Sequence, residues 1–214
     1  MRVLIACAGP DKWRTQDGTP RHLVPVDGEP LLHRTVRQAL TYSDDVYVLA
    51  GNDDRYRIAG AKWKVHAEPT PNEFVTSRQW WSQAGRTVLL LGDTYYTDHA
   101  IDVIAGYNRQ RWQLFGRKNA SKVTGTPWGE YFACSWWPQH QQMMLEHLDQ
   151  VILARAVGIA QRCTGWELLR SIQRTPLNEH VVNPMWFTEI DDLTDDFDTR
   201  HEYEQHPAAE VASV

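Results

Sequence analysis

Short apolar runs alternate along this chain with segments in which apolar residues recur at helical spacing. Strand-like runs cover residues 3–7, 46–50, 87–91, 113–116, 131–136 and 185–190, and helical patterns cover 30–40, 76–84, 98–107, 139–159 and 199–205. This alternation is typical of an α/β protein with a mostly parallel central sheet and helices on both faces. We expect one α/β domain over residues 1–206, followed by a loose C-terminal tail over 207–214.

Composition narrows the class of protein. The chain has 214 residues, 42% of them hydrophobic, which is enough for a substantial core. The net charge of −5 argues against a uniformly basic surface for bulk nucleic-acid binding. Three widely spaced cysteines form no CxxC pair, and no apolar run approaches the ~18 residues of a membrane span. We expect a cytoplasmic protein with reduced thiols and no membrane association.

The loop after the first strand is a candidate nucleotide-binding segment. In open α/β sheets, ligands bind beyond the carboxyl ends of the strands. Here Ala8 and Gly9 allow close backbone approach to a phosphate, and Lys12, Arg14 and Arg21 supply positive charge. An ordinary surface turn with solvated bases explains the same residues, because one glycine is weaker than a full glycine-rich motif.

A second candidate follows the strongest predicted strand, residues 87–91. Gly92 and Asp93 come directly after it. A carboxylate at this place points toward the ligand region of the sheet, and its hard oxygens suit Mg²⁺. The alternative is a turn aspartate that caps the next segment.

A third candidate is the acidic stretch over residues 189–199, in which five aspartates fall within residues 191–198. A cation would relieve their mutual repulsion. Helix capping is the alternative, because Thr199 and Glu202 fit a capping box and acids are favoured at a helix start. Both interpretations are compatible if Asp198 caps the helix while Asp191 binds metal.

These motifs, taken in order, resemble those of the sugar-nucleotidyltransferase family. The segment over residues 8–32 is similar to the family's glycine-rich loop with an arginine, its Pro-Lys-x-Leu motif and its Gly-x-Pro-Leu helix start, with Arg21 in place of the lysine. Leu91-Gly92-Asp93 resembles the family's metal-binding aspartate after a central strand. The segments 189–191 and 196–199 each resemble its second metal motif, which leaves two registers.

The resemblance implies a Rossmann-like fold of the nucleotide-diphospho-sugar transferase type. It implies that Ala8, Gly9, Lys12 and Gly92 bind the nucleotide and that Arg14 and Arg21 are catalytic. By the same resemblance, Asp93 and either Asp191 or Asp198 hold Mg²⁺ or Mn²⁺. The implied reaction joins a nucleotidyl group from an NTP to a phosphorylated small molecule, such as a sugar 1-phosphate, and releases pyrophosphate.

Two other functions remain open. A related glycosyltransferase would move a sugar from a nucleotide-sugar, and the basic, aromatic segment 107–128 would suit a small-molecule or nucleic-acid acceptor. A solvated basic face with core aromatics explains that segment equally well. An inactive nucleotide-binding protein is the third hypothesis. The sequence does not indicate an oligomeric state.

Overall fold

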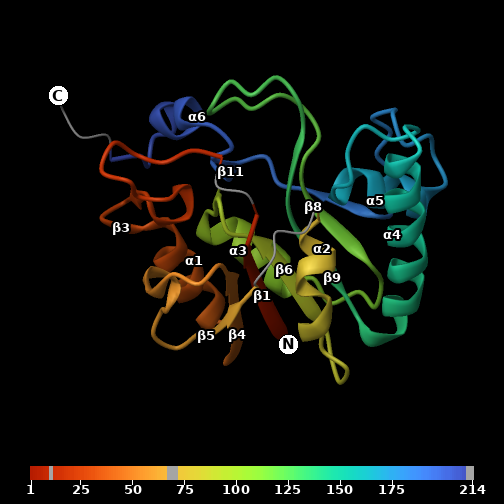
Figure 1. Ribbon diagram of the computed structural model, residues 1–214, viewed down its shortest axis with the longest axis horizontal. Coiled ribbons are helices and arrows are strands. Elements are labelled where there is room, and N and C mark those ends of the chain that lie inside the picture. The colour runs from red at the N-terminus through yellow and green to blue at the C-terminus, as the bar shows by residue number, and fades with distance from the viewer. Residues whose placement is uncertain (10–11, 67–71, 211–214) are drawn as a thin grey trace.

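One seven-stranded sheet forms the centre of the computed structural model, which describes residues 1–9, 12–66 and 72–210. The strand order is β10-β8-β9-β6-β1-β4-β5 (Figure 1). The strands are β1 (Arg2–Cys7), β4 (Asp45–Ala50), β5 (Lys62–Val65), β6 (Thr87–Leu91), β8 (Gln113–Arg117), β9 (Glu130–Trp136) and β10 (Phe187–Glu189). β1 pairs parallel with β4 and β6, whereas β9 runs antiparallel to β6 and β8. The predicted α/β fold with a mostly parallel sheet is confirmed.

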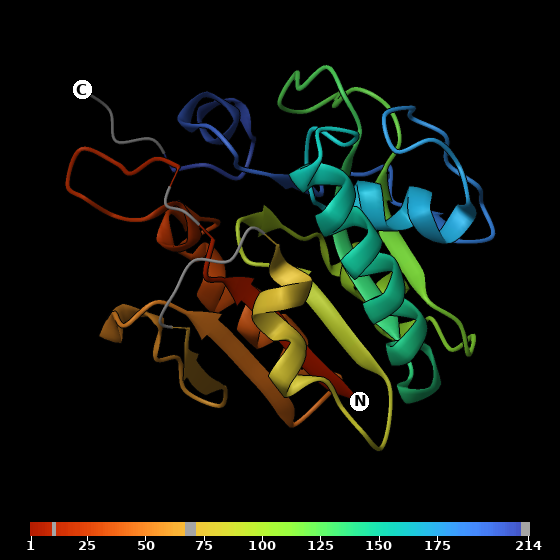
Figure 2. The same cartoon turned by 45° about the vertical axis from the view of Figure 1, so that its right-hand side comes forward.

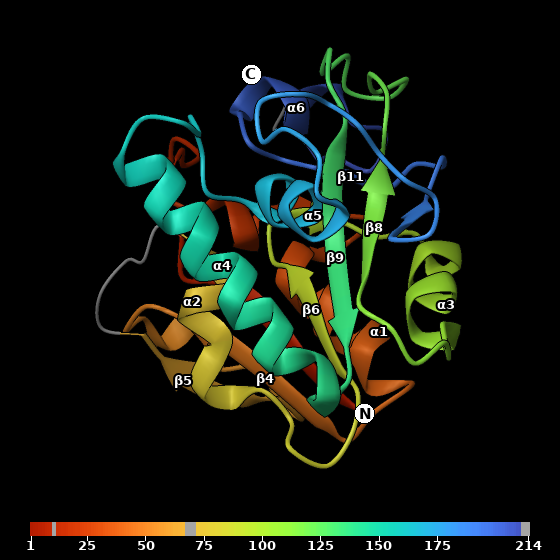
Figure 3. The same ribbon diagram turned by 90° about the vertical axis from the view of Figure 1, so that its right-hand side faces the viewer.

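Helices cover both faces of the sheet because successive strand residues point to opposite sides. On one face, Val3 and Ile5 of β1 pack with α1 (Leu31–Leu40) and α3 (Asp98–Gly106). On the other, Leu4 packs with α2 (Glu73–Ser77), α4 (Gln141–Ala156) and α5 (Gly165–Gln173). Figures 2 and 3 show α4 running across the front of its face, and Figure 3 shows α3 on the other side of the strands.

Capping side chains fix two helix starts close to the predicted places. Thr97 accepts a hydrogen bond from the backbone N–H of Ala100 at the start of α3. Thr199 and Glu202 form the predicted capping box of α6 (Arg200–Gln205). Thr199, and not Asp198, therefore caps this helix, which leaves the Asp198 side chain for other contacts.

Two very short ladders bring distant segments together beyond the main sheet. β7 (Thr94–Tyr95) pairs antiparallel with β11 (Asp195–Asp196), and the Phe197 backbone N–H donates to the Asp93 carbonyl at 2.8 Å. β2 (Pro25–Val26) and β3 (Glu29–Pro30) form a hairpin. Its turn residues, Asp27 and Gly28, have positive φ values of 49° and 84°, as a primed turn requires. The first ladder holds the acidic C-terminal stretch beside the end of β6.

The structure differs from the sequence prediction at several elements. In place of the helix expected over 76–84, α2 ends at Ser77 and a 3₁₀ turn follows at Arg78–Trp80. The next residue, Trp81, is buried, and its indole N–H donates to the Ser77 hydroxyl. Strand β5 and helix α5 were not predicted.

The loose tail expected from residue 207 does not hold for residues 208–210. The Asp27 backbone N–H donates to the Ala208 carbonyl at 3.1 Å, and Ala209 bridges to Val26. Residues 211–214 lie outside the described part. Across the described ranges, no helix is both long and apolar enough to cross a bilayer.

Candidate functional site

A cavity of about 280 Å³ lies at the edge of the sheet where β1 and β6 end. Its lining comes from the first loop, the 3₁₀ turn Arg21–Leu23, the start of α2, the start of β9, the segment before α5 and the residues after β11. These segments lie far apart in the sequence and meet around the upper ends of the strands in Figure 1. This is the position at which open α/β sheets bind ligands.

Arg21 occupies the middle of the ionic contacts in this cavity. Its guanidinium Nη2 lies 3.0 Å from Oδ2 of Asp93, and its Nη1 lies 3.2 Å from Oδ1 of Asp198. Lys12 forms a second ion pair with Asp198. Arg21 is 5% exposed, so its charge is confined between the two carboxylates. The structure thus brings together four of the predicted site residues, Lys12, Arg21, Asp93 and Asp198, which come from three separate segments of the chain.

The acidic groups of the cavity fall into two electrostatic classes. Burial would raise the pKa of the Asp93 carboxyl, but the charges of Arg21, His22 and Lys12 outweigh it and hold that pKa below its ordinary value. Burial and the neighbouring carboxylates Glu130 and Asp198 raise the pKa of Asp196 well above its usual range. Burial, followed by the charge of Asp198, raises the pKa of Glu130 to about 8. On this side of the cavity, burial and the crowding of carboxyls therefore favour the protonated, uncharged forms of Glu130 and Asp196.

Asp195 belongs to a buried structural network and not to the cavity. Its Oδ1 accepts from Nη2 of Arg117 at 2.7 Å, and its Oδ2 accepts from the hydroxyls of Ser121 and Thr124. Asp195 is fully buried. The network ties the hairpin between β8 and β9 to the chain just before Asp196 and Asp198, and so positions both sides of the cavity.

The carboxylates of Asp93 and Asp198 are the donors best placed for a divalent cation. Within the described ranges, no group of three or more His, Cys, Asp or Glu side chains is arranged to hold a metal ion. Mg²⁺ commonly takes only one or two protein carboxylates and completes its shell with water and substrate phosphates. Asp93 and Asp198 each contact Arg21 through one carboxylate oxygen, and the second oxygen of each is a hard donor of the kind that this mode of binding uses. Asp191 lies elsewhere: it is exposed, does not line the cavity, and forms an ion pair with Lys122 at 2.8 Å.

The other predicted residues divide between the cavity and its support. Ala8 and Gly9 line the cavity, as expected. Gly92 does not line it; a Cβ there would lie 2.2 Å from Sγ of Cys7 and 2.9 Å from the Ala6 carbonyl oxygen, so this glycine allows β1 and β6 to approach closely. Arg14 is also outside the lining, and its Nη1 lies 3.4 Å from the Gly18 carbonyl oxygen. Pro10 and Asp11 fall outside the described residues.

Sequence reasoning missed the wall of the cavity opposite the first loop. Glu73, Tyr131 and Trp166 line this wall, and the Tyr131 hydroxyl donates to Oε1 of Glu73 at 2.7 Å. Burial raises the pKa of Glu73 to about 7. The capping box of Thr164 and Glu167 was the available signal, because it marks the start of α5 beside the cavity.

The basic, aromatic segment 107–128 is mainly part of the core. Trp112 and Phe115 are fully buried, and Arg117 pairs with Asp195. Lys118 forms an ion pair with Glu189 at 2.6 Å, in addition to the pair of Lys122 with Asp191. Trp128, by contrast, is 58% exposed and lines the cavity. These pairings make an open surface for phosphate backbones a poor description of the segment.

No protein-family model and no curated protein sequence matches the chain. Solved structures do. A protein assigned as a glucose-1-phosphate thymidylyltransferase from Bacillus anthracis, solved with sucrose, superposes with a TM-score of 0.62 at 12% identity, covering 97% of this chain and 94% of that one. The CTP:phosphocholine cytidylyltransferase of Streptococcus pneumoniae superposes with a TM-score of 0.59 at 12% identity, covering 95% and 96%. HddC from Yersinia pseudotuberculosis, complexed with GMP-PN, gives 0.54 at 11% identity, covering 96% and 98%.

The chain has a nucleotidyltransferase-like fold. At these identities the likeness concerns the fold, so the chemistry of this chain has to come from its own cavity. In this nucleotidyltransferase-like fold, the cavity combines three cationic side chains (Lys12, Arg21 and Arg162), the carboxyl groups of Asp93 and Asp198, three carboxyls of raised pKa (Glu73, Glu130 and Asp196) and exposed aromatic surface. The cations suit phosphate groups, and the aromatic surface suits a ring.

Proposed function

We propose that this protein is a nucleotidyltransferase that joins a nucleotidyl group from an NTP to a phosphorylated small molecule and releases pyrophosphate. The observation that carries the proposal is the buried Arg21 between Asp93 and Asp198, in a cavity at the ligand-binding edge of a nucleotidyltransferase-like fold. The cytidylyltransferase and the protein assigned as a thymidylyltransferase, both similar in fold, support the same general reaction.

In the proposed reaction, an oxygen of the acceptor phosphate forms a bond to the α-phosphorus of the NTP. The bond from that phosphorus to the bridging oxygen breaks, and pyrophosphate leaves with its electron pair. No covalent nucleophile of the protein is needed, because phosphoryl-type transfer depends on positioning and electrostatics. Lys12 and Arg21 act as donors to phosphate oxygens, and a preorganised donor of this kind contributes roughly 3–4 kcal/mol to the transition state.

The fixed position of Arg21 suits this task. Its side chain is buried and held on both terminal nitrogens, so little reorganisation is needed when charge develops on a phosphate oxygen. We propose that Asp93 and Asp198 hold Mg²⁺ or Mn²⁺, which would neutralise phosphate charge and orient the reacting groups. Asp198 is preferred over Asp191 as the second ligand because Asp198 shares Arg21 with Asp93, whereas Asp191 pairs with Lys122.

Pyrophosphate release tests the proposal directly. The protein is incubated with Mg²⁺, each of the four NTPs and a panel of phosphorylated acceptors. Asp93→Asn should lower release by at least about a hundredfold while leaving the fold intact by circular dichroism, because it removes an ionised ligand from the reacting centre. Asp149→Asn, a change of the same type at an exposed position on α4, is the matched control and should have no effect.

A second pair of variants separates the two registers of the acidic stretch. Asp198→Asn should abolish activity, and Asp191→Asn should retain it. The reverse result would place the metal on Asp191, and full activity in Asp93→Asn would refute the metal assignment altogether.

Two rival functions give different results in the same assay. UDP or GDP release from nucleotide-sugars, with no pyrophosphate from any NTP, would replace the proposal with glycosyl transfer. Nucleotide binding without turnover of either kind would indicate an inactive nucleotide-binding protein. The two carboxylates of Asp93 and Asp198, both at the ligand-binding edge of the sheet, favour the nucleotidyltransferase over the inactive protein, because simple nucleotide binding does not require a carboxylate pair beside the phosphates.

A further inference from the structure

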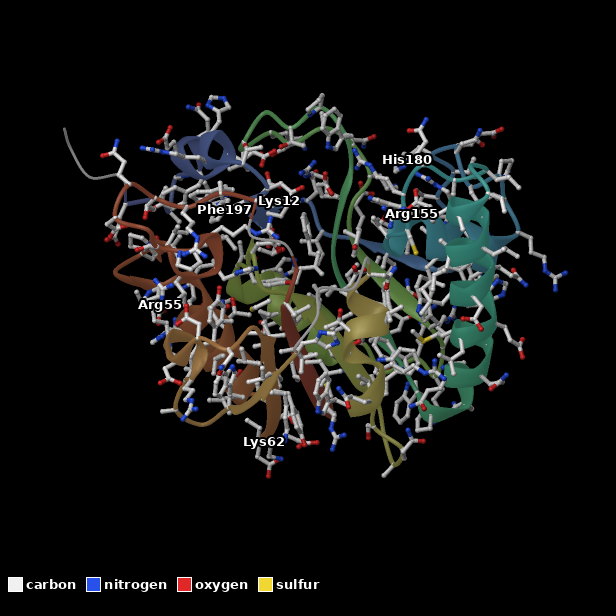
Figure 4. The ribbon with its side chains drawn as sticks, viewed as in Figure 1. Lys12, Arg55, Lys62, Arg155, His180 and Phe197 are labelled. Atoms are coloured by element: carbon white, nitrogen blue, oxygen red, sulfur yellow. The ribbon has the colours of Figure 1, made fainter. Side chains whose placement is uncertain are left out.

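A second cavity of about 550 Å³ adjoins the first on the side away from the first loop. The two share five lining residues: Trp128, Glu130, Arg162, Thr164 and Trp166. The far side of the second cavity comes from residues 118–120 of the β8–β9 hairpin and from residues 177–180 after α5. Figure 4 shows Lys12, in the first cavity, and His180, in the second, at the same end of the sheet with the hairpin between them in this view.

Trp128 forms an exposed ring surface on a fixed backbone at the boundary of the two cavities. Arg117 donates from Nη1 to the carbonyl oxygens of Asn119 and Trp128, at 2.7 and 3.0 Å. A Cβ at Gly129 would lie 2.5 Å from the Lys118 carbonyl oxygen, so the two strands of the hairpin are in close contact here. The Trp128 indole nevertheless remains 58% exposed. A large apolar ring held in place at a cavity mouth is suited to packing against another ring.

Three amide side chains line the second cavity with their hydrogen-bonding groups available. Asn119, Gln161 and Asn178 make no side-chain hydrogen bond within the part of the chain that the structure describes. An amide carries both donors and an acceptor, and a sugar hydroxyl likewise donates and accepts. These residues therefore match a hydroxyl-rich ligand better than an apolar one.

Charge in the second cavity argues against a polyanion. Lys118 pairs with Glu189, and Arg170 pairs with Glu167 at 3.1 Å. Arg162, which lines both cavities, has no ion pair or hydrogen bond to any described residue. One available guanidinium at the junction suits a single phosphate group, whereas a polynucleotide would require several.

We infer that the acceptor is a phosphorylated saccharide of more than one ring. Its phosphate contacts Arg162 and reacts in the first cavity, and its further ring packs on Trp128 among the amides of the second cavity. This inference rests on the proposed nucleotidyl transfer and specifies its second substrate. The second cavity is the larger of the two, and the three amides line it and not the first cavity, so it offers contacts beyond those at Arg162 for a further ring.

The test compares acceptors that differ only in length. Pyrophosphate release is measured with hexose 1-phosphates and with the disaccharide 1-phosphates that contain the same phosphorylated ring. At least one disaccharide 1-phosphate should have a KM about tenfold below that of its matched monosaccharide, the effect of one or two net hydrogen bonds. A panel in which no disaccharide improves on its monosaccharide would overturn the inference while leaving nucleotidyl transfer intact.

Variants then assign the preference to the second cavity. In the double variant Asn119→Ala/Asn178→Ala, the ratio of the two KM values should fall toward one, with kcat little changed. Asn108→Ala, an exposed asparagine in the loop at the other end of β8, is the matched control and should keep the full ratio. An unchanged ratio in the double variant would contradict the role of this cavity.

Failure of the proposed function has a different signature. If no acceptor supports the release of pyrophosphate, calorimetry with the unphosphorylated disaccharides measures saccharide binding to the second cavity directly. Binding that is lost in the double variant would retain a saccharide site while refuting nucleotidyl transfer. No binding to any disaccharide would refute both.

Discussion

The ion pair between Arg117 and Asp195 provides a quantitative test of how the site is held together. The pair is at 2.7 Å, and the two side chains are 6% and 1% exposed. Replacing Arg117 with Met would leave the Asp195 carboxylate buried with no cationic partner, because only the hydroxyls of Ser121 and Thr124 and the backbone N–H of Asp196 remain as hydrogen-bond donors to it among the described residues. An uncompensated buried charge costs about 3–5 kcal/mol of stability. This is a large part of the free energy of unfolding of a typical domain, which is roughly 5–15 kcal/mol.

Thermal and urea unfolding measure this loss. In a chain of this length, about 3–5 kcal/mol corresponds to a fall in Tm of roughly 6–20 °C. Lys122→Met is the matched control on the same hairpin, because its ion pair with Asp191 has side chains 78% and 54% exposed. Such exposed pairs contribute at most about 1 kcal/mol. The control should therefore lower Tm by no more than about 4 °C.

The double variant Arg117→Met/Asp195→Asn distinguishes a charge effect from a packing effect. If the loss in Arg117→Met arises from the unpaired carboxylate, neutralising Asp195 as well should recover part of it. The two single changes would then show a coupling of about 0.5–3 kcal/mol. Equal losses in Arg117→Met and Lys122→Met, or strict additivity in the double variant, would refute the reasoning.

Two further predictions concern residues around the cavity. Gly92→Ala should lower the Tm and reduce activity, because the new Cβ would overlap Sγ of Cys7. The double variant Cys7→Ala/Gly92→Ala should recover part of the lost Tm. No recovery would exclude this contact as the cause. Glu73→Gln should change how stability depends on pH. Burial raises the pKa of Glu73 from 4.5 to about 7, so its contribution is full below pH 4.5 and is lost as the pH rises to about 7. Urea unfolding across this range should show a smaller decline in the Gln variant, and an identical decline would contradict the raised pKa.

The fold was largely predictable because its signals are local. The runs of β1, β4 and β6 are short, apolar and bounded by turn residues, and α1 and α3 have clear apolar periodicity. Strand β5 was missed because its sequence, Lys-Trp-Lys-Val, is that of a half-exposed edge strand without an apolar run. Helix α2 was misplaced because the Asn72 cap, which accepts from the N–H of Phe74, was not recognised.

The candidate site was predicted only in part. Residues with a local sequence signal were found, and residues that meet only through the fold were missed. Ala8, Gly9 and Asp93 follow parallel strands, so their position at the ligand edge follows from topology. Gly92 was grouped with them, although its role is close packing against Cys7, which only the paired backbones reveal. The wall containing Glu73, Tyr131 and Trp166 combines three distant segments, and no local pattern indicates that they meet.

The choice between Asp191 and Asp198 in the acidic stretch could be made only from the structure. Sequence patterns favour Asp191 and Asp198 equally, since each follows a segment that resembles the same motif. The choice depends on the ladder of β7 with β11, in which Asp196 pairs with Thr94 and the Phe197 N–H bonds to the Asp93 carbonyl. That ladder joins residues about a hundred positions apart and places Asp198, rather than Asp191, on the guanidinium that also holds Asp93. The short ladder therefore holds Asp93 and Asp198 near each other through backbone hydrogen bonds, and together with Arg21 it offsets the mutual repulsion that would separate the two carboxylates.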